Sequence, residues 1–264
     1  MSDPTAELVT ERHGAVLLVR LNRPQARNAL TGAVIRGIGA AVRTAEQDPD
    51  VRVVVLTGTG DRAFCAGMDL RAFADGGDFS GNGDPDSVAA VDAYERLSRG
   101  KTDVPVIGAA NGSAVGGGLE LLLGCDIIIA AATASFGLPE VKRGLFPGGS
   151  GTALGSRIPL GVALEMTLTG EAIDADRAYR LGLANSVVPQ EEVLTTALAL
   201  AERIAANAPL GLAACKELVR LGVTDAASAT ERLSHWQAIV FSSEDAKEGA
   251  SAFMQKRAPV WQGK

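Results

Sequence analysis

The sequence predicts a mixed α/β protein whose C-terminal part is entirely helical. Short apolar runs of strand length alternate with helical patterns up to residue 189, and beyond it only helical patterns occur. Several of the apolar runs are nearly continuous, as expected of parallel strands that are covered on both faces. A chain of 264 residues suits one large domain with an appendage. We therefore expect a core over residues 1–189 and a helical region over residues 190–264.

The individual elements follow from the period of the apolar residues and from the residues that interrupt it. Apolar runs predict strands over residues 15–21, 51–57, 104–110 and 126–130. Amphipathic spacing predicts helices over residues 31–47 and 87–99, and a short helix after the glycines at 116–118. Four further helices are expected over residues 190–207, 210–221, 224–242 and 243–257. Residues 58–69 are expected to form a loop, as are residues 75–86, where glycine and aspartate gather.

Composition and charge exclude several classes of protein. The formal charge is −6 and only 4% of the residues are aromatic, so the chain has neither a basic field nor stacking surfaces for nucleic acid. The N-terminal residues lack the apolar region of a leader peptide, and the longest apolar run, 121–136, is interrupted by Asp126 and too short to cross a bilayer. Three cysteines without paired spacing and two histidines offer neither a disulfide framework nor a multi-histidine metal site. We expect a cytoplasmic protein without nucleic-acid, membrane or metal partners.

Motifs for other chemistries fail on their context. Residues 58–63 fit a loose dinucleotide-binding pattern after a strand, but the residues that follow are poor at starting a helix. Residues 100–102 resemble the end of a phosphate loop whose first glycine is missing, and Ser150 is out of register for a nucleophile elbow. Cys65 has no base near it in the sequence and is interpreted as a small packed thiol. A nucleotide-dependent oxidoreductase is therefore disfavoured.

Two carboxylates stand in the apolar, glycine-rich stretch from Val106 to Thr152. Glu120 follows three glycines, and Glu140 follows Pro139. Carboxylates are rarely buried without a partner or a task, and two that meet in one apolar pocket form a general acid/base pair. The alternative is that each glutamate lies on a solvated helix face. Spacing alone leaves both interpretations open.

Gly116–Gly118 lie where an apolar helix is expected to begin. Glycine lets a ligand approach the backbone closely, and a helix start leaves amides unpaired at the positive end of the macrodipole. Such amides suit a developing oxyanion, and the loop at 64–67 offers a second donor. Two backbone amides aimed at one thioester oxygen would stabilise an enolate. A tight turn with close helix packing is the alternative interpretation of these glycines.

Six motifs, in order, resemble the enoyl-CoA hydratase/isomerase (crotonase) superfamily, and most of all its enoyl-CoA hydratases. They are LNRPQARNAL at 21–30, AFCAGMDL at 63–70, NGSAVGGGLELLLGCDIIIA at 111–130, FGLPEVKRGLFPGGSGT at 136–152, LTGEAIDADRAYRLGLANSVVP at 168–189 and KEGASAFMQKR at 247–257. Each is weak alone, but the six together cover most of the chain. The resemblance implies a crotonase (ClpP-like) fold of repeated ββα units, closed by a C-terminal helical trimerisation region.

The resemblance also implies roles for particular residues. Ala66 and Gly117 match the oxyanion-hole positions through their backbone amides, and Glu120 and Glu140 match the two catalytic glutamates. The substrate-binding positions implied in this way are Arg27, Ala66, Gly67, Asp69, Leu70, Gly117 and Gly148, with Gly148 beside the acyl chain and Asp69 in the loop on the CoA side. The implied ligand is an acyl-CoA thioester, and because CoA is part of the substrate, no cofactor is expected. The implied assembly is a homotrimer or a dimer of trimers.

The implied reaction is hydration of a 2-enoyl-CoA to a 3-hydroxyacyl-CoA, as in fatty-acid β-oxidation. Glu120 would activate water for attack at C3, and Glu140 would deliver a proton to C2. The chain reads PGGSGTALGSRI where these hydratases read close to PGAGGTQRL, and Lys142–Arg143 replace an often apolar pair, so the acyl preference is not implied. One alternative is an enoyl-CoA isomerase or another crotonase-family acyl-CoA lyase or isomerase, with the same oxyanion hole. Another is a catalytically silent acyl-CoA-binding subunit, against which the two intact glutamates count.

Overall fold

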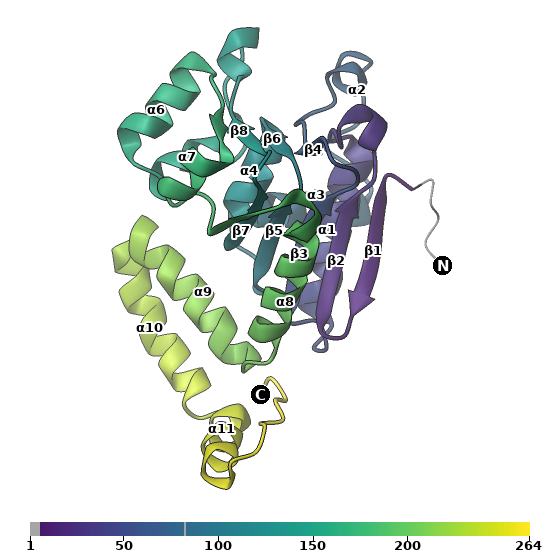
Figure 1. Cartoon of the computed structure of the whole chain (residues 1–264). Helices are drawn as coiled ribbons and strands as arrows, with labels where there is room; N and C mark the ends of the chain where they lie inside the picture. Colours follow the sequence, from purple (N-terminus) through teal and green to yellow (C-terminus); the bar gives the residue numbers. More distant parts are fainter. Residues whose placement is uncertain (1–5, 82) are drawn as a thin grey trace.

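The structure, a computed structural model, describes residues 6–81 and 83–264 and is organised by two β-sheets (Figure 1). The larger sheet has the strand order β1-β2-β3-β5-β7-β10, and the smaller has the order β4-β6-β8-β9. The strands of the larger sheet are β1 (Leu8–His13), β2 (Val16–Leu21), β3 (Val53–Gly58), β5 (Val106–Ala110), β7 (Ile127–Ala131) and β10 (Ser186–Val188). Those of the smaller sheet are β4 (Ala63–Cys65), β6 (Ser113–Val115), β8 (Ser135–Gly137) and β9 (Ile173–Asp174).

Successive strands are divided between the two sheets. β3, β5 and β7 enter the larger sheet, and the strand that follows each of them, β4, β6 or β8, enters the smaller one. Helices α1 (Gly32–Gln47), α3 (Pro85–Ser98) and α4 (Gly117–Gly124) follow the strand pairs β1–β2, β3–β4 and β5–β6. Neighbouring strands are parallel except β1–β2 and β8–β9. The predicted α/β fold of repeated ββα units is therefore confirmed.

The core lies on both faces of the larger sheet. β3 and β5 are buried along their whole length, which explains their nearly continuous apolar sequences. Helices α1 and α3 pack against each other on one face of the sheet. Helix α8 (Val193–Ala205) covers the other face, where its buried alanines at 197 and 201 allow a close approach (Figure 1).

The sequence missed the two edge strands of the larger sheet, β1 and β10, and the whole of the smaller sheet. β1 mixes half-buried and exposed residues without a regular alternation. β10 and the strands of the smaller sheet are only two or three residues long, too short to show a period. The predicted loop over 58–69 therefore contains β4. The predicted loop over 75–86 begins after α2 (Leu70–Ala74), and its last two residues already belong to α3. Asp84 caps α3 by accepting from the Ser87 amide at 2.9 Å. Residue 82 of this segment lies outside the described residues.

The C-terminal region contains the four predicted helices, α8, α9 (Pro209–Thr224), α10 (Ala226–Val240) and α11 (Glu244–Gln255). Glu217 of α9 joins α9 to α10, because its carboxylate accepts from Arg232 at 2.6 Å and from Trp236 at 2.7 Å. Helix α8 lies on the larger sheet, so the part that extends away from the core begins at α9 (Figure 1). The division of the chain at residue 189 stays a prediction.

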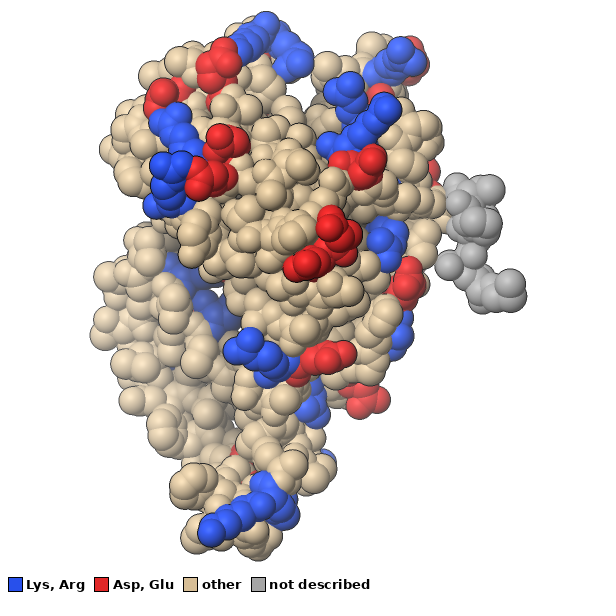
Figure 2. All heavy atoms as spheres, in the orientation of Figure 1, with Lys and Arg blue, Asp and Glu red and all other residues tan. Residues whose placement is uncertain are grey.

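The surface has no large patch of one charge on the face that Figure 2 shows, and its lower left, over α9 and α10, has few charged side chains. Large apolar side chains are exposed on these helices and just after α10, among them Val219, Val223, Leu233 and Phe241. Phe241 is 80% exposed, and exposed apolar side chains of this size suit the region of α9 and α10 to a protein partner. In the described part of the chain, no helix combines the length and the hydrophobicity needed to cross a membrane.

Candidate active site

The site is centred on the first turn of α4, and its glycines serve two purposes. Gly116 precedes the helix with a φ of +56°, which favours glycine. A side chain at Gly118 would overlap the carbonyl oxygen of Cys65, so this glycine allows the helix to pack closely on β4. The amide of Gly117, the first residue of the helix, has no hydrogen-bond acceptor among the described residues. Close packing and a free amide thus both occur, at different glycines.

Ala66 does not supply the second free amide, contrary to the expectation from the sequence. Its N–H donates to the carbonyl of Arg27 at 3.0 Å, so it is already used within the chain. Gly67, the next residue, has a φ of +88° and brings the chain close to α4. A side chain at Gly67 would come within 3.2 Å of the Gly117 nitrogen, so its role is to allow this approach.

The Met68 amide, unlike that of Ala66, has no hydrogen-bond acceptor among the described residues. The residues on either side of Met68 pair with Leu30 through backbone hydrogen bonds of 2.8 and 2.9 Å. In such a parallel pairing the residue between the two bonds points its own N–H to the opposite side. For Met68 that side faces the start of α4, where its nitrogen lies 3.7 Å from the position that a Cβ on Gly117 would occupy. The structure therefore brings two unpaired amides, of Met68 and Gly117, to one place.

Glu120 lies on the first turn of α4 and is fixed by the loop that follows Pro147. Its Oε1 accepts from the amides of Gly149 and Gly151, both at 2.9 Å. The hydroxyl of Ser150 donates to the backbone carbonyl of Glu120 at 2.9 Å. A Cβ at Gly149 would come within 2.8 Å of Oε2, so the loop can lie against the carboxylate only because this residue is glycine.

Glu140 begins a short 3-10 helix, η2 (Glu140–Arg143), directly after Pro139. Its Oε1 lies 2.9 Å from the position of a Cβ on Gly116, at the start of α4. Its Oε2 is buried and has no hydrogen-bond partner among the described residues. Burial raises the pKa of Glu140, the nearby charge of Glu120 raises it further, and Arg143 opposes the shift. Glu140 therefore keeps its proton to a higher pH than an exposed glutamate does, which suits a proton donor.

The two glutamates thus approach the same space from different elements. Each is partly buried, and neither lies on a fully solvated helix face. Gly148, expected beside an acyl chain, is exposed, and the nearest atom to a Cβ there is the Phe146 carbonyl oxygen at 3.9 Å. Glu120 is held instead by Gly149 and Gly151, which lie close to Gly148 in the chain and were not predicted as site residues.

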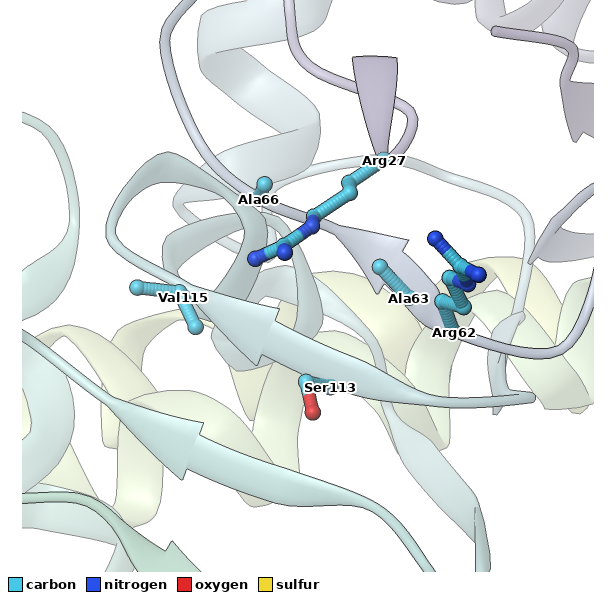
Figure 3. Close-up of a pocket in the computed structure, with 6 residues that line it drawn as sticks. All are labelled: Arg27, Arg62, Ala63, Ala66, Ser113 and Val115. Atoms are coloured by element: carbon cyan, nitrogen blue, oxygen red, sulfur yellow. The ribbon is translucent and has the colours of Figure 1, made fainter. Parts of the chain in front are cut away.

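A cavity of about 350 Å³ opens beside Ala66 (Figure 3). It is lined by Arg27, Arg62, Ala63, Ala66, Ser113 and Val115, and the Arg27 side chain extends between Ala66 and Val115. A second cavity of about 330 Å³ shares Arg27 and Arg62. Within the described ranges, neither guanidinium has a hydrogen bond or an ion pair, so both are available to an anionic ligand. Arg62, in the loop before β4, was missed because an arginine in an exposed turn has no sequence signature.

The motif at 21–30 contains an unusual turn at Arg27 and Asn28. Arg27 and Asn28 both have positive φ, of 51° and 55°. The buried Asn28 side chain holds this turn, because it donates to the carbonyls of Thr59 and Ala63 at 3.0 and 2.8 Å. It also accepts from the Arg23 amide at 3.0 Å. Arg27 is thereby fixed at the wall of the cavity.

Asp69 and Leu70 lie at the start of α2. Asp69 caps α2, with its carboxylate accepting from the amides of Arg71 and Ala72 and pairing with Arg23 at 2.9 Å. These contacts lower its pKa, the Ala72 amide most of all. The carboxylate is thus used in organising the loop, while the Leu70 side chain is exposed. Among residues 6–81 and 83–264, no group of three His, Cys, Asp or Glu side chains is placed to hold a metal.

Comparisons with known proteins identify the family of the chain. The profile of the enoyl-CoA hydratase/isomerase family matches residues 11–264. A carnitinyl-CoA dehydratase of Salmonella typhi is 38% identical over 260 residues, which cover 96% of this chain and 97% of the relative. Enoyl-CoA hydratase EchA19 of Mycobacterium tuberculosis is 40% identical over 266 residues, which cover 98% of this chain and 97% of the relative.

Solved structures are equally similar. An enoyl-CoA hydratase of Mycobacterium tuberculosis H37Rv has a TM-score of 0.89 with this chain at 39% identity, covering 98% of this chain and 100% of that one. An enoyl-CoA hydratase of Bacillus anthracis has a TM-score of 0.86 at 33% identity. The fold and these relatives indicate an enzyme of the crotonase type. The chain belongs to the enoyl-CoA hydratase/isomerase family.

Proposed function

We propose that the protein is an enoyl-CoA hydratase, which adds water across the 2,3 double bond of a 2-enoyl-CoA. The observation that supports this most is the placing of Glu120 and Glu140 beside the amides of Met68 and Gly117. Adding water requires a base to activate the water and an acid to protonate carbon. The site offers one carboxylate fixed by amides and one carboxyl whose pKa is raised by burial.

The mechanism follows from these placements. The thioester carbonyl oxygen accepts from the amides of Met68 and Gly117, which polarises the double bond and stabilises the negative charge of the enolate. The amide bonds to Glu120 hold its carboxylate in position to orient water and take its proton during attack at C3. Glu140 then gives a proton to C2, which completes the 3-hydroxyacyl-CoA. The oxyanion donor is thus Met68 in place of Ala66.

Two arginines near the oxyanion site are suited to hold the CoA part of the substrate. The phosphates of CoA suit the unpaired guanidiniums of Arg27 and Arg62, on the two cavities next to the oxyanion site. The reaction uses no further cofactor. A homotrimer or dimer of trimers would cover the apolar face of α9 and α10, as a large exposed apolar surface requires. We also propose that the protein acts in fatty-acid β-oxidation and is located in the cytoplasm.

The test compares hydration with isomerisation in the purified protein. Hydration of crotonyl-CoA removes the absorbance of the conjugated thioester, whereas binding alone preserves it. We expect loss of absorbance, and slower conversion of a matched 3-enoyl-CoA to its 2-enoyl isomer. Faster isomerisation than hydration would replace the proposal by the isomerase alternative. Binding with neither reaction would indicate an acyl-CoA-binding subunit. A panel of enoyl-CoA chain lengths measures the acyl preference.

A further inference from the structure

The C-terminal end of α4, opposite the active site, is held by two arginines. The carbonyls of Leu123, Gly124 and Cys125 lie at or beyond the last turn, where a helix leaves acceptors without partners. Arg157 donates to the carbonyls of Leu123 and Cys125 at 2.9 and 3.0 Å. Arg220 donates to those of Gly124 and Cys125, also at 2.9 and 3.0 Å. Guanidinium groups at this end of a helix are favourable for both hydrogen bonding and the dipole.

Arg220 and Lys216 lie one turn apart on α9, in the part of the C-terminal region that extends away from the core (α9–α11, called the tail below). Both contact Asp126, next to the end of α4. Asp126 pairs with Arg220 at 2.8 Å and with Lys216 at 2.9 Å. The Lys216 ammonium also donates to the Thr102 hydroxyl at 2.6 Å and the Val104 carbonyl at 2.7 Å. Its side chain is only 7% exposed, and burial lowers its pKa while Asp126 opposes that change. Ion pairs buried to this degree require good geometry, which fixes the groups that form them.

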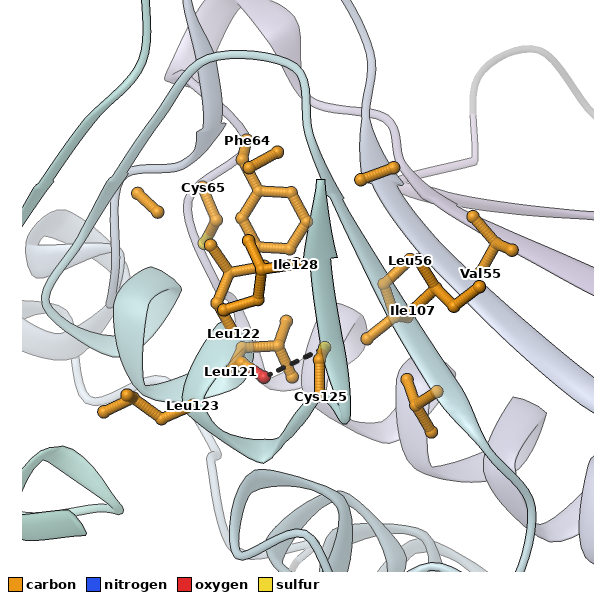
Figure 4. Close-up of a cluster of buried hydrophobic side chains, with 14 of the residues drawn as sticks. Val55, Leu56, Phe64, Cys65, Ile107, Leu121, Leu122, Leu123, Cys125 and Ile128 are labelled. Atoms are coloured by element: carbon orange, nitrogen blue, oxygen red, sulfur yellow. Dashed lines mark hydrogen bonds between the residues drawn. The ribbon is translucent and has the colours of Figure 1, made fainter. Parts of the chain in front are cut away.

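The helix held in this way is short. It has eight residues, too few to be stable by itself, and its apolar side chains pack in the core, as Leu121 and Leu122 show in Figure 4. Its first turn presents the Gly117 amide and Glu120 to the site, while its last turn is bonded to α9. A shift of the last turn moves the first, because a helix this short behaves as one rigid piece.

We propose that Arg220, Lys216 and Asp126 position the active-site helix, so that α9 supports the site from behind. The three residues touch no substrate in this proposal. They act through α4, by holding the Gly117 amide in register with Met68 and Glu120 in register with the loop after Pro147. The tail would thereby have a second task besides offering an exposed apolar face. The effect on hydration, but not the effect on α4 itself, rests on the proposed function.

The test compares two variants of the full-length protein. Arg220→Met removes the guanidinium that bonds to α4. Arg232→Met is the matched control, because it removes a guanidinium of the same tail whose hydrogen bonds go to Glu217 on α9. The first measurement is amide hydrogen exchange over residues 117–124, read by mass spectrometry. The second is the division of the hydration rate into kcat and KM.

We expect exchange over residues 117–124 to become about 10-fold faster in Arg220→Met and to stay at the wild-type rate in Arg232→Met. We also expect kcat to fall by roughly 10-fold with KM almost unchanged, since a misplacement of about 1 Å costs up to ~10²-fold. Arg220→Lys keeps the charge but lacks the planar fork, so it should recover much of kcat. If Arg220→Met does not fold, Asp126→Asn, which keeps an oxygen for the Val106 amide, takes its place.

Two results would overturn the inference. One is exchange over 117–124 that is unchanged in Arg220→Met. The other is an equal increase in both arginine variants, because that would show a general loosening of the tail. If the wild-type protein does not hydrate enoyl-CoA, the proposed function fails, but the exchange comparison still decides this inference.

Discussion

The two sides of the active site are held in opposite ways. On the α4 side, hydrogen bonds fix the groups: Oε1 of Glu120 accepts from two amides, and the start of the helix presents the Gly117 amide. On the η2 side, Glu140 has an oxygen that is buried without a partner among the described residues. The first side is organised by geometry and the second by burial. Adding water needs both, one group held still to aim the water and one that keeps a proton to give.

The largest effects are expected from removing either carboxylate. Glu120→Gln and Glu140→Gln should each lower the hydration rate by roughly 10²–10⁴-fold, while acyl-CoA binding is largely kept. The double variant should lose little more than either single one, because two groups that act on one water behave as a unit. Steady-state rates and a binding titration check this. If one variant kept nearly full turnover, the site would need only one carboxylate. The difference between the α4 side and the η2 side would then play no part in catalysis.

The next effect concerns the backbone amide that pairs with α4. Met68→Pro removes the N–H that faces Gly117 and should lower kcat by about 10²–10³-fold. Met68→Leu keeps the amide and a similar apolar side chain, so it should be mild. Circular dichroism shows whether the proline variant is folded. Equal losses in the two variants would mean that the side chain matters, and the oxyanion site would have to be placed elsewhere.

A smaller effect separates two adjacent glycines. In Gly149→Ala the new Cβ would come within 2.8 Å of Glu120 Oε2, whereas in Gly148→Ala it would meet nothing closer than 3.9 Å. Gly149→Ala should therefore lower kcat by roughly 10-fold, since it displaces a carboxylate that must be aimed. Gly148→Ala should change kcat by less than about 2-fold on the same reasoning. The reverse order would show that an acyl chain lies against Gly148 and that Glu120 tolerates displacement.

The sequence predicted the larger sheet better than the site. Strands such as β3 are long, buried and uninterrupted, so composition alone identifies them. The strands of the smaller sheet are too short for any period, although β4 leads directly to the oxyanion loop. Both glutamates were identified, but their convergence depends on a loop that folds back from Pro147 to Glu120, which local patterns do not describe.

The choice between Ala66 and Met68 shows why the remainder could not be predicted. Both stand in the segment AFCAGMDL, and both have a backbone amide. Which amide is free depends on pairing with Arg27 and Leu30, more than 30 residues earlier in the chain. A motif gives the neighbourhood of such a donor, whereas the direction of an N–H is decided by its long-range partner.

The smallest effect tests whether burial controls the proton of Glu140. Because burial raises its pKa in the folded protein, the folded state binds more protons than the unfolded chain once the pH exceeds the ordinary value of 4.5. The contribution of this carboxyl to the free energy of unfolding therefore falls as the pH rises from 4.5 through the folded pKa. Glu140→Gln cannot titrate, so its stability relative to wild type should rise over that range. Urea unfolding between about pH 3 and pH 7 measures the difference.

Glu248 provides a control of opposite sign. Arg257 and the Val260 amide lower its pKa from 4.5 to about 2, so its stabilising contribution is present above 4.5 and is lost as the pH falls toward 2. Glu248→Gln should therefore become less stable relative to wild type as the pH rises toward 4.5. A difference for Glu140→Gln that stays flat or takes the sign of Glu248→Gln would mean that Glu140 is ionised in the folded protein. The acid that protonates C2 would then have to be sought among other groups.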